Sequence, residues 1–104
     1  MEQALIIEQQ QGEFDGFPKN KPLVESISKE RNIDEAYIGE FIYRGEDFPE
    51  RGIFQNDTLY LDMSAGEVKD DSIYIKADNV ILGKAIYLQR TFEYEYVDGI
   101  ADEG

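Results

Sequence analysis

Cysteine, histidine and tryptophan are all absent from the 104 residues of this chain. Without cysteine the chain can form no disulfide, no thiolate nucleophile and no thiolate metal site, and without histidine it lacks the commonest general base and metal ligand. A hydroxyl nucleophile in this sequence would therefore need a lysine as its base. Glycine-rich phosphate loops and EF-hand spacings are missing as well, so we expect no cofactor and no metal.

Positive charge is scarce, because 10 Lys and Arg stand against 23 Asp and Glu, for a formal net charge of −13. Affinity for a phosphate backbone comes mainly from Lys and Arg that release condensed counterions, so we expect no direct binding of nucleic acid. A protein partner, basic if charge guides the contact, fits this composition better. The acidic pairs Glu46-Asp47 and Asp70-Asp71 are interpreted as solvated carboxylates in turns.

Long apolar runs are also lacking. None approaches the ~20 residues of a membrane span. Residues 4–7 are too short for the core of a signal peptide, and no positive charge precedes them. We therefore expect a soluble, cytoplasmic protein without a membrane segment.

Short β-type segments dominate what is present. Hydrophobic residues make up 41% of the chain, with seven Tyr and six Phe, which is enough for one compact core. Runs rich in aromatic and β-branched residues, separated by Gly, Asn, Asp and Ser, predict strands at 3–8, 37–44, 58–62, 72–77, 80–82, 85–88 and 92–97. Pro22 followed by an apolar stripe at Leu23, Val24 and Ile27 predicts a helix over 22–31 that packs on the sheet. The predicted fold is mostly β (α+β), an antiparallel β domain with one short helix.

The chain divides into three parts in this interpretation. Residues 1–21 form an N-terminal strand and a flexible arm, 22–97 form the β domain, and 98–104 form an acidic C-terminal tail. Strand 92–97 alternates aromatic and acidic residues, which is typical of an exposed edge or a dimer-forming strand. We predict that Phe92, Tyr94 and Tyr96 lie in a homodimer interface. Tyr74 and Tyr87 also suit a binding surface, although half-buried strand positions favour Tyr for packing alone.

The order of several landmarks resembles the LexA/UmuD family of self-cleaving serine–lysine peptidases, and within it the short UmuD-like branch. That family has a Gly-Phe-Pro cleavage segment, a helix, a turn that carries the nucleophilic Ser, two characteristic strands, and a hairpin that brings the catalytic Lys. The matching segments here are residues 16–18 (GFP), 22–31, 45–48 (GEDF), 52–62 (GIFQNDTLYLD), 71–77 (DSIYIKA) and Lys84. The resemblance covers most of the chain, from Gly16 to about Arg90.

Two departures from the family pattern indicate a catalytically inactive member. Asp47 occupies the place of the nucleophilic Ser, and a carboxylate is a poor nucleophile toward an amide. It would also favour the charged form of Lys84, which then could not act as a base. At the cleavage-like segment, Asp15 precedes Gly16 where the family usually has Ala or Cys. We therefore predict an ion pair between Asp47 and Lys84, and expect Asp47→Ala to destabilise the fold more than Asp57→Ala or Asp70→Ala.

The resemblance implies a regulatory or accessory protein that acts by dimerisation and protein–protein contact in the DNA-damage (SOS) response or in a prophage. The implied partners are the RecA filament, a translesion DNA polymerase or a repressor of the same fold. Two alternatives stay open. One is an acidic mimic of nucleic acid that inhibits a DNA-binding protein, and the other is an active Ser–Lys peptidase that uses a different serine, for example Ser64.

Overall fold

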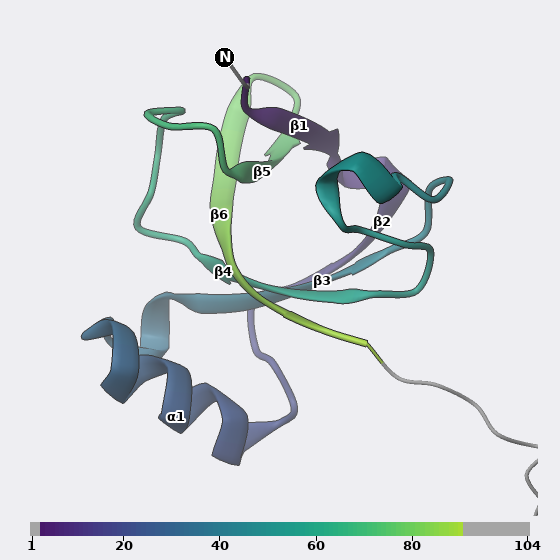
Figure 1. The fold of residues 1–104 in the computed structure, drawn as a ribbon. Helices are drawn as coiled ribbons and strands as arrows, with labels where there is room; N and C mark the ends of the chain where they lie inside the picture. Colours follow the sequence, from purple (N-terminus) through teal and green to yellow (C-terminus); the bar gives the residue numbers. More distant parts are fainter. Residues whose placement is uncertain (1–2, 91–104) are drawn as a thin grey trace, which may run out of the picture.

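Six strands and one α-helix make up residues 3–90, the part of the chain described by this computed structural model (Figure 1). The strands are β1 (Leu5–Glu8), β2 (Gly12–Asp15), β3 (Ile38–Tyr43), β4 (Thr58–Asp62), β5 (Ile73–Ala77) and β6 (Val80–Gln89), and the helix is α1 (Lys21–Arg31). Three short 3₁₀ helices, η1 (Gln9–Gln11), η2 (Glu35–Tyr37) and η3 (Pro49–Arg51), lie in the connections. The predicted interface residues Phe92, Tyr94 and Tyr96 lie outside the described residues.

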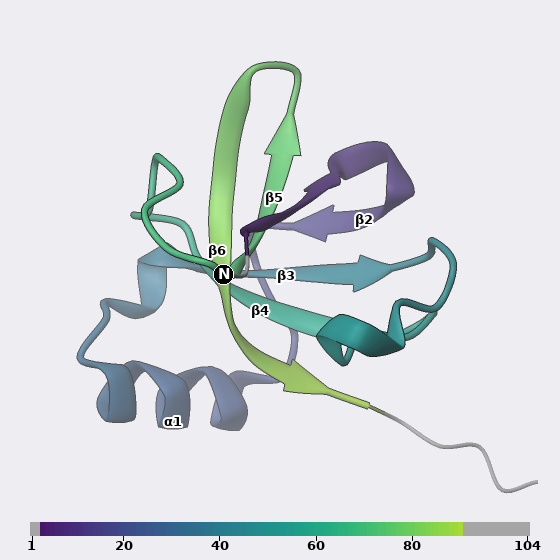
Figure 2. The same ribbon diagram turned by 45° about the horizontal axis from the view of Figure 1, so that its top comes forward.

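The strands form one curled sheet in the order β1-β5-β6-β4-β3-β2, with α1 packed against it (Figures 1 and 2). This confirms a mostly β fold of the α+β class. The main core lies inside the curl and is built from alternate residues of the strands, including Phe41, Leu59, Leu61 and Ile75, which are at most 1% exposed. Alternation follows from the pleat of a strand, which points successive side chains to opposite faces.

Helix α1 begins and ends at residues suited to those places. The Asn20 side chain accepts a hydrogen bond from the backbone N–H of Leu23, and Asn32 closes the helix in the left-handed conformation with φ 58°. Val24 and Ile27 are buried in a second apolar cluster that includes Ile38 and Tyr60 from the sheet. The predicted helix and its apolar stripe are confirmed.

The N-terminal segment differs from the prediction in two ways. Strand β1 runs parallel to β5, so the sheet is mixed rather than purely antiparallel. Residues Gly12–Asp15, expected to belong to an irregular arm, form β2, which pairs antiparallel with β3. Glycine suits Gly12 because a Cβ there would lie 2.2 Å from the carbonyl oxygen of Ile42. The glycine therefore allows a close strand contact and does not mark a break in the sheet.

Strand β6 is continuous where two strands, 80–82 and 85–88, were expected. Gly83 lies inside the strand, and a Cβ at that position would be 3.0 Å from the Cβ of Leu61. From the sequence alone, a glycine that permits close packing inside a strand cannot be told from a glycine in a turn. The hairpin turn before β6 falls at Asp78-Asn79 as predicted, with Asp78 in the left-handed region at φ 57°.

Helix α1, the longest helix within residues 3–90, is too short and too polar to span a membrane, and no other described helix meets that requirement either.

Candidate functional site

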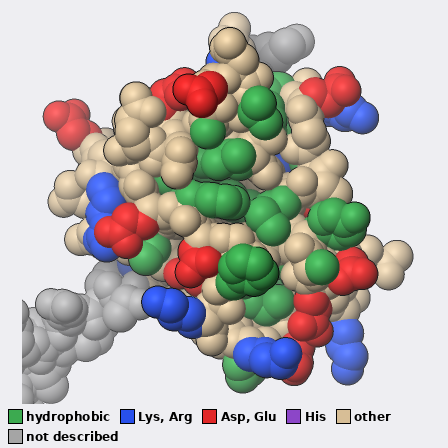
Figure 3. Space-filling view, turned by 180° about the vertical axis from the view of Figure 1, so that it is seen from behind, with side chains coloured by type: hydrophobic (Ala, Val, Ile, Leu, Met, Phe, Trp, Pro, Cys, Tyr) green, Lys and Arg blue, Asp and Glu red, His purple; other side chains and the backbone are tan. Residues whose placement is uncertain are grey.

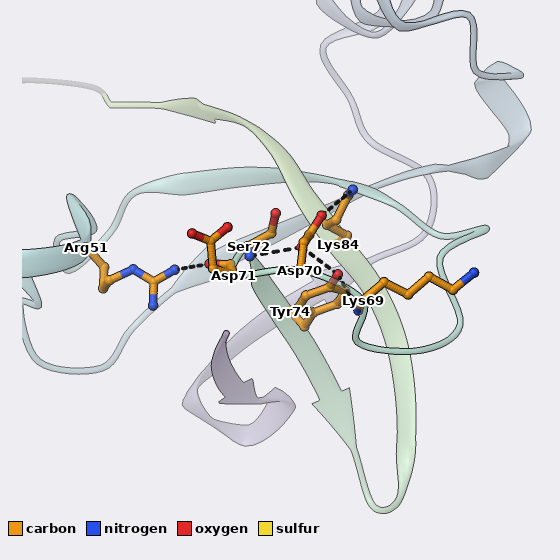
Figure 4. A network of polar contacts seen from close by, with 7 residues as sticks. All are labelled: Arg51, Lys69, Asp70, Asp71, Ser72, Tyr74 and Lys84. Carbon is orange, nitrogen blue, oxygen red and sulfur yellow. Dashed lines mark hydrogen bonds and ion pairs between the residues drawn. The ribbon is translucent and has the colours of Figure 1, made fainter. Parts of the chain in front are cut away.

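Lys84 lies in β6 and takes part in a polar network at the start of β5 (Figure 4). Its Nζ donates to Asp70 Oδ2 at 3.2 Å, and the opposite carboxylate oxygen, Asp70 Oδ1, accepts from the Tyr74 hydroxyl at 2.8 Å. The backbone N–H of Ser72 donates to the same Oδ1 at 3.0 Å. Asp70 thus receives three hydrogen bonds on two oxygens.

These bonds favour the ionised form of Asp70. The hydrogen bond from Tyr74, followed by those from Ser72, holds the pKa of the Asp70 carboxyl well below its usual range. The Asp70 side chain is 43% exposed and the Lys84 side chain is 30% exposed. Solvent therefore screens their attraction but does not separate the pair. Asp70 therefore presents a negative charge to Lys84 at neutral pH.

Asp47 lies elsewhere, in the loop between β3 and η3. Its Oδ1 accepts a hydrogen bond from the backbone N–H of Gln55 at 2.8 Å, as a turn aspartate does. The pKa of Arg90 is raised mainly by its hydrogen bond to Asp57, and the negative charges of Asp57 and Asp47 raise it further. Asp47 therefore faces the Arg90 end of the sheet.

The predicted ion pair between Asp47 and Lys84 is wrong. No salt bridge joins them within residues 3–90, where Lys84 pairs with Asp70 instead. Lys84 and Arg90 are six residues apart, and that length of extended chain spans on the order of 20 Å. Asp70, and not Asp47, reaches Lys84 because Asp70 lies in the short segment before β5, whose Tyr74 is the cross-strand neighbour of Lys84.

The one buried carboxylate among the described residues is Asp57, with 1% of its surface exposed. Arg90 holds it through two hydrogen bonds of 2.7 Å, from Nε to Oδ1 and from Nη2 to Oδ2. The backbone N–H of Phe54 donates to Oδ2 at 2.8 Å, and the Arg90 guanidinium lies 4.6 Å from the centre of the Phe54 ring. These contacts therefore do not support the expectation that Asp47→Ala destabilises the fold more than Asp57→Ala does.

The cleavage-like pair Asp15 and Gly16 lies at the end of β2. Asp15 is in register with Glu40 of β3, and its carboxylate accepts a hydrogen bond from the backbone N–H of Phe17 at 2.7 Å. Phe17 itself is 88% exposed.

Ser64 and Lys84 line the same pocket, which has a volume of about 350 Å³ and is also bordered by Lys69 and Tyr74. The Ser64 hydroxyl donates to Asp62 Oδ1 at 2.6 Å, and Lys84 is paired with Asp70. In this arrangement the Ser64 hydroxyl and the Lys84 amine are each engaged by a carboxylate, and not by one another as a nucleophile and its base would be.

A second pocket, of about 310 Å³, runs along the later part of β6. Strand β5 pairs with β6 only over Val80 to Lys84, and the apolar residues Ile73, Ala85 and Leu88 line the space beyond that point. Figure 3 shows a face of the molecule on which hydrophobic side chains gather at the centre, with charged side chains around them. An apolar area with a charged rim is typical of a contact surface.

The tyrosines divide between core and surface. Tyr74 is only 1% exposed, so its ring belongs to the interior and its hydroxyl to the Asp70 network. Tyr87 is 43% exposed and meets Tyr60 edge to face, with ring centroids 6.1 Å apart. Of these two, only Tyr87 is available to a partner.

No protein-family model, curated protein or solved structure matches the chain. Within residues 3–90, no three acidic side chains are grouped so that they could hold a metal ion.

Proposed function

We propose that this chain is a non-cleaving regulatory or accessory protein, similar to the UmuD branch of the LexA/UmuD family, that acts by binding other proteins and by dimerising. The single observation that carries the proposal is the pairing of Lys84 with Asp70. A lysine serves as a base in a serine–lysine dyad only after it loses its proton, and an adjacent carboxylate opposes that loss.

The order of elements supports the family part of the proposal. Helix α1 is followed by β3, the Gly45–Phe48 loop, β4, β5 and the β5–β6 hairpin, in the sequence in which the family landmarks occur. Lys84 also stands in the second strand of that hairpin, as the resemblance implies. The proposed partners are the RecA filament, a translesion polymerase or a repressor of the same fold, and the proposed location is the cytoplasm.

The surface supports the binding part. Tyr87 is exposed beside the apolar pocket that Ile73 and Leu88 line, so a partner strand or side chain could cover this region of β6. Residues 92–97 continue the chain just beyond β6, and their alternation of aromatic and acidic residues suits a strand with one apolar face. We propose that Phe92, Tyr94 and Tyr96 contribute to the dimer interface.

Sedimentation equilibrium of the full chain tests this function. We expect a dimer at micromolar concentration. Its dissociation constant should change little between low and high salt, because salt screens charge–charge attraction and not the burial of aromatic side chains. Tyr94→Glu should weaken the dimer, whereas Glu103→Gln, in the acidic tail, should not. A mass of one chain at every concentration would contradict the proposal.

The acidic-mimic alternative makes the opposite prediction about salt. A protein that imitates nucleic acid through its charge of −13 would bind a polycation such as polylysine and release it steeply as ionic strength rises. Tight, salt-sensitive binding of polylysine by a chain that remains monomeric would favour that alternative.

A further inference from the structure

The turn between β2 and α1 presents an aromatic side chain beside a hollow. Phe17 is 88% exposed, and the carboxylate of Asp15 holds its backbone N–H at 2.7 Å, which fixes the turn. Phe17 and Pro18 form one side of a pocket of about 250 Å³, and Val24 of α1 and Ala36 of η2 form another. The projecting ring and the hollow therefore lie on one patch of the surface, which we name the Phe17 patch.

The size of the hollow favours a side chain as its occupant. Pockets for small molecules usually measure about 300–1,000 Å³, so this one is smaller than the typical range. A single aromatic ring fits a hollow of this size, and a buried aromatic side chain removes about 150–250 Å² from water.

Two opposite charges stand at the rim of this hollow. Lys21 and Glu35 border the same pocket, and both are exposed. No salt bridge joins them within the described chain, whose three ion pairs involve other residues. An isologous contact places one patch against its own copy, which would bring Lys21 of each chain toward Glu35 of the other.

From these observations we infer that the Phe17 patch is a self-association surface whose occupant is a second copy of this chain. Phe17 of each copy enters the hollow between Pro18, Val24 and Ala36 of the other, and two Lys21–Glu35 pairs form at the rim. This contact is separate from the interface proposed for residues 92–97, and it does not rest on that proposal. A chain that used both contacts would assemble beyond a dimer once its concentration exceeded the weaker of the two dissociation constants.

Sedimentation equilibrium of full-length variants in a Tyr94→Glu background tests the inference. That background disables the proposed 92–97 interface, so any remaining dimer must use another surface. We expect a dimer to remain there, and we expect Phe17→Ala to raise its dissociation constant by at least about 100-fold, because each dimer loses two aromatic anchors. The matched control is Val80→Ala, which removes another exposed apolar side chain, 60% exposed at the β5–β6 hairpin, and should leave the constant unchanged.

Charge reversal tests the orientation of the two copies. Lys21→Glu should weaken the dimer by about tenfold, through repulsion from Glu35 of the other copy, and Lys21→Glu combined with Glu35→Lys should restore it. Circular dichroism confirms that each variant is folded. Equal constants for Phe17→Ala and Val80→Ala, or failure of the double reversal to restore association, would overturn the inference.

The same data separate this inference from the proposed function. A chain that is dimeric in its natural sequence and fully monomeric with Tyr94→Glu alone would overturn the inference and support the 92–97 interface. A dimer that is insensitive to Tyr94→Glu and lost with Phe17→Ala would support the inference and contradict that interface.

Discussion

Replacement of Asp57 by Ala should destabilise this protein more than any other single carboxylate change within residues 3–90. The Asp57 carboxylate is 1% exposed and accepts three hydrogen bonds, two from Arg90 and one from the backbone N–H of Phe54. Alanine removes all three and leaves the Phe54 N–H without its acceptor. The contacts tie the β3–β4 loop to the end of β6, so their loss affects two distant parts of the chain.

The magnitude follows from the burial of the carboxylate. Hydrogen bonds to a charged group contribute roughly 1.5–3 kcal/mol each, and breaking a buried ion pair costs about 3–5 kcal/mol. The Arg90 side chain is 34% exposed and regains water when its partner is lost, so the expected cost of Asp57→Ala falls below that range, at about 2–3 kcal/mol. For a chain of this length, this corresponds to a fall in Tm of roughly 10–20 °C.

Urea unfolding followed by far-UV circular dichroism and tyrosine fluorescence measures this cost. The matched control is Glu13→Ala, because Glu13 pairs with Arg44 on the surface, with side chains 65% and 44% exposed. That pair should contribute about 1 kcal/mol or less. Equal losses for Asp57→Ala and Glu13→Ala, or a loss below about 1 kcal/mol for Asp57→Ala, would refute the reasoning from burial.

Three further predictions concern titration and the candidate site. The pKa of Asp70 is lower in the folded than in the unfolded chain, so its contribution to stability is present above about pH 4 and is lost as the pH falls below that. Urea midpoints of the natural chain and Asp70→Asn should therefore converge in acid, with the neighbouring Asp71→Asn as the matched control for loss of one surface carboxylate. Burial raises the pKa values of Tyr43 and Tyr60 above 10.0, so their contribution to stability is full below pH 10 and is lost as the pH rises further. Absorbance at alkaline pH should show phenols that ionise above pH 10.0, and Tyr60→Phe should remove one of them. The double variant Asp47→Ser with Asp70→Asn should not self-cleave efficiently, because Asp47 lies at the other end of the sheet from Lys84, and rapid cleavage seen by mass spectrometry would contradict this placement.

Local sequence patterns predicted the helix and most strands. Helix α1 was recognisable from Pro22 and the spacing of Val24 and Ile27, and β4 from the short apolar and aromatic run in residues 58–62, because both signals come from neighbouring residues. The glycines were misread. Gly83 lies inside β6 because it packs closely on Leu61, and a close contact with a distant residue leaves no mark in the local sequence.

The polar contacts were the least predictable part. Asp57 and Arg90 are 33 residues apart, and Asp70 and Lys84 are 14 apart. Strand register decides which carboxylate pairs with which Lys or Arg side chain. Several Asp residues near turns are candidates for each of these cations. The family resemblance supplied a partner for Lys84 by position, but the geometry of the β5–β6 hairpin supplied a nearer one in Asp70.

The intact mass of the purified chain after prolonged incubation tests most directly the claim that this protein binds but does not cut. The incubation should run from neutral to mildly alkaline pH, since loss of a lysine proton favours cleavage in a serine–lysine dyad, and it should be repeated with RecA filament. We expect one species of 12.0 kDa under every condition. A fragment that begins at Gly16 would contradict it.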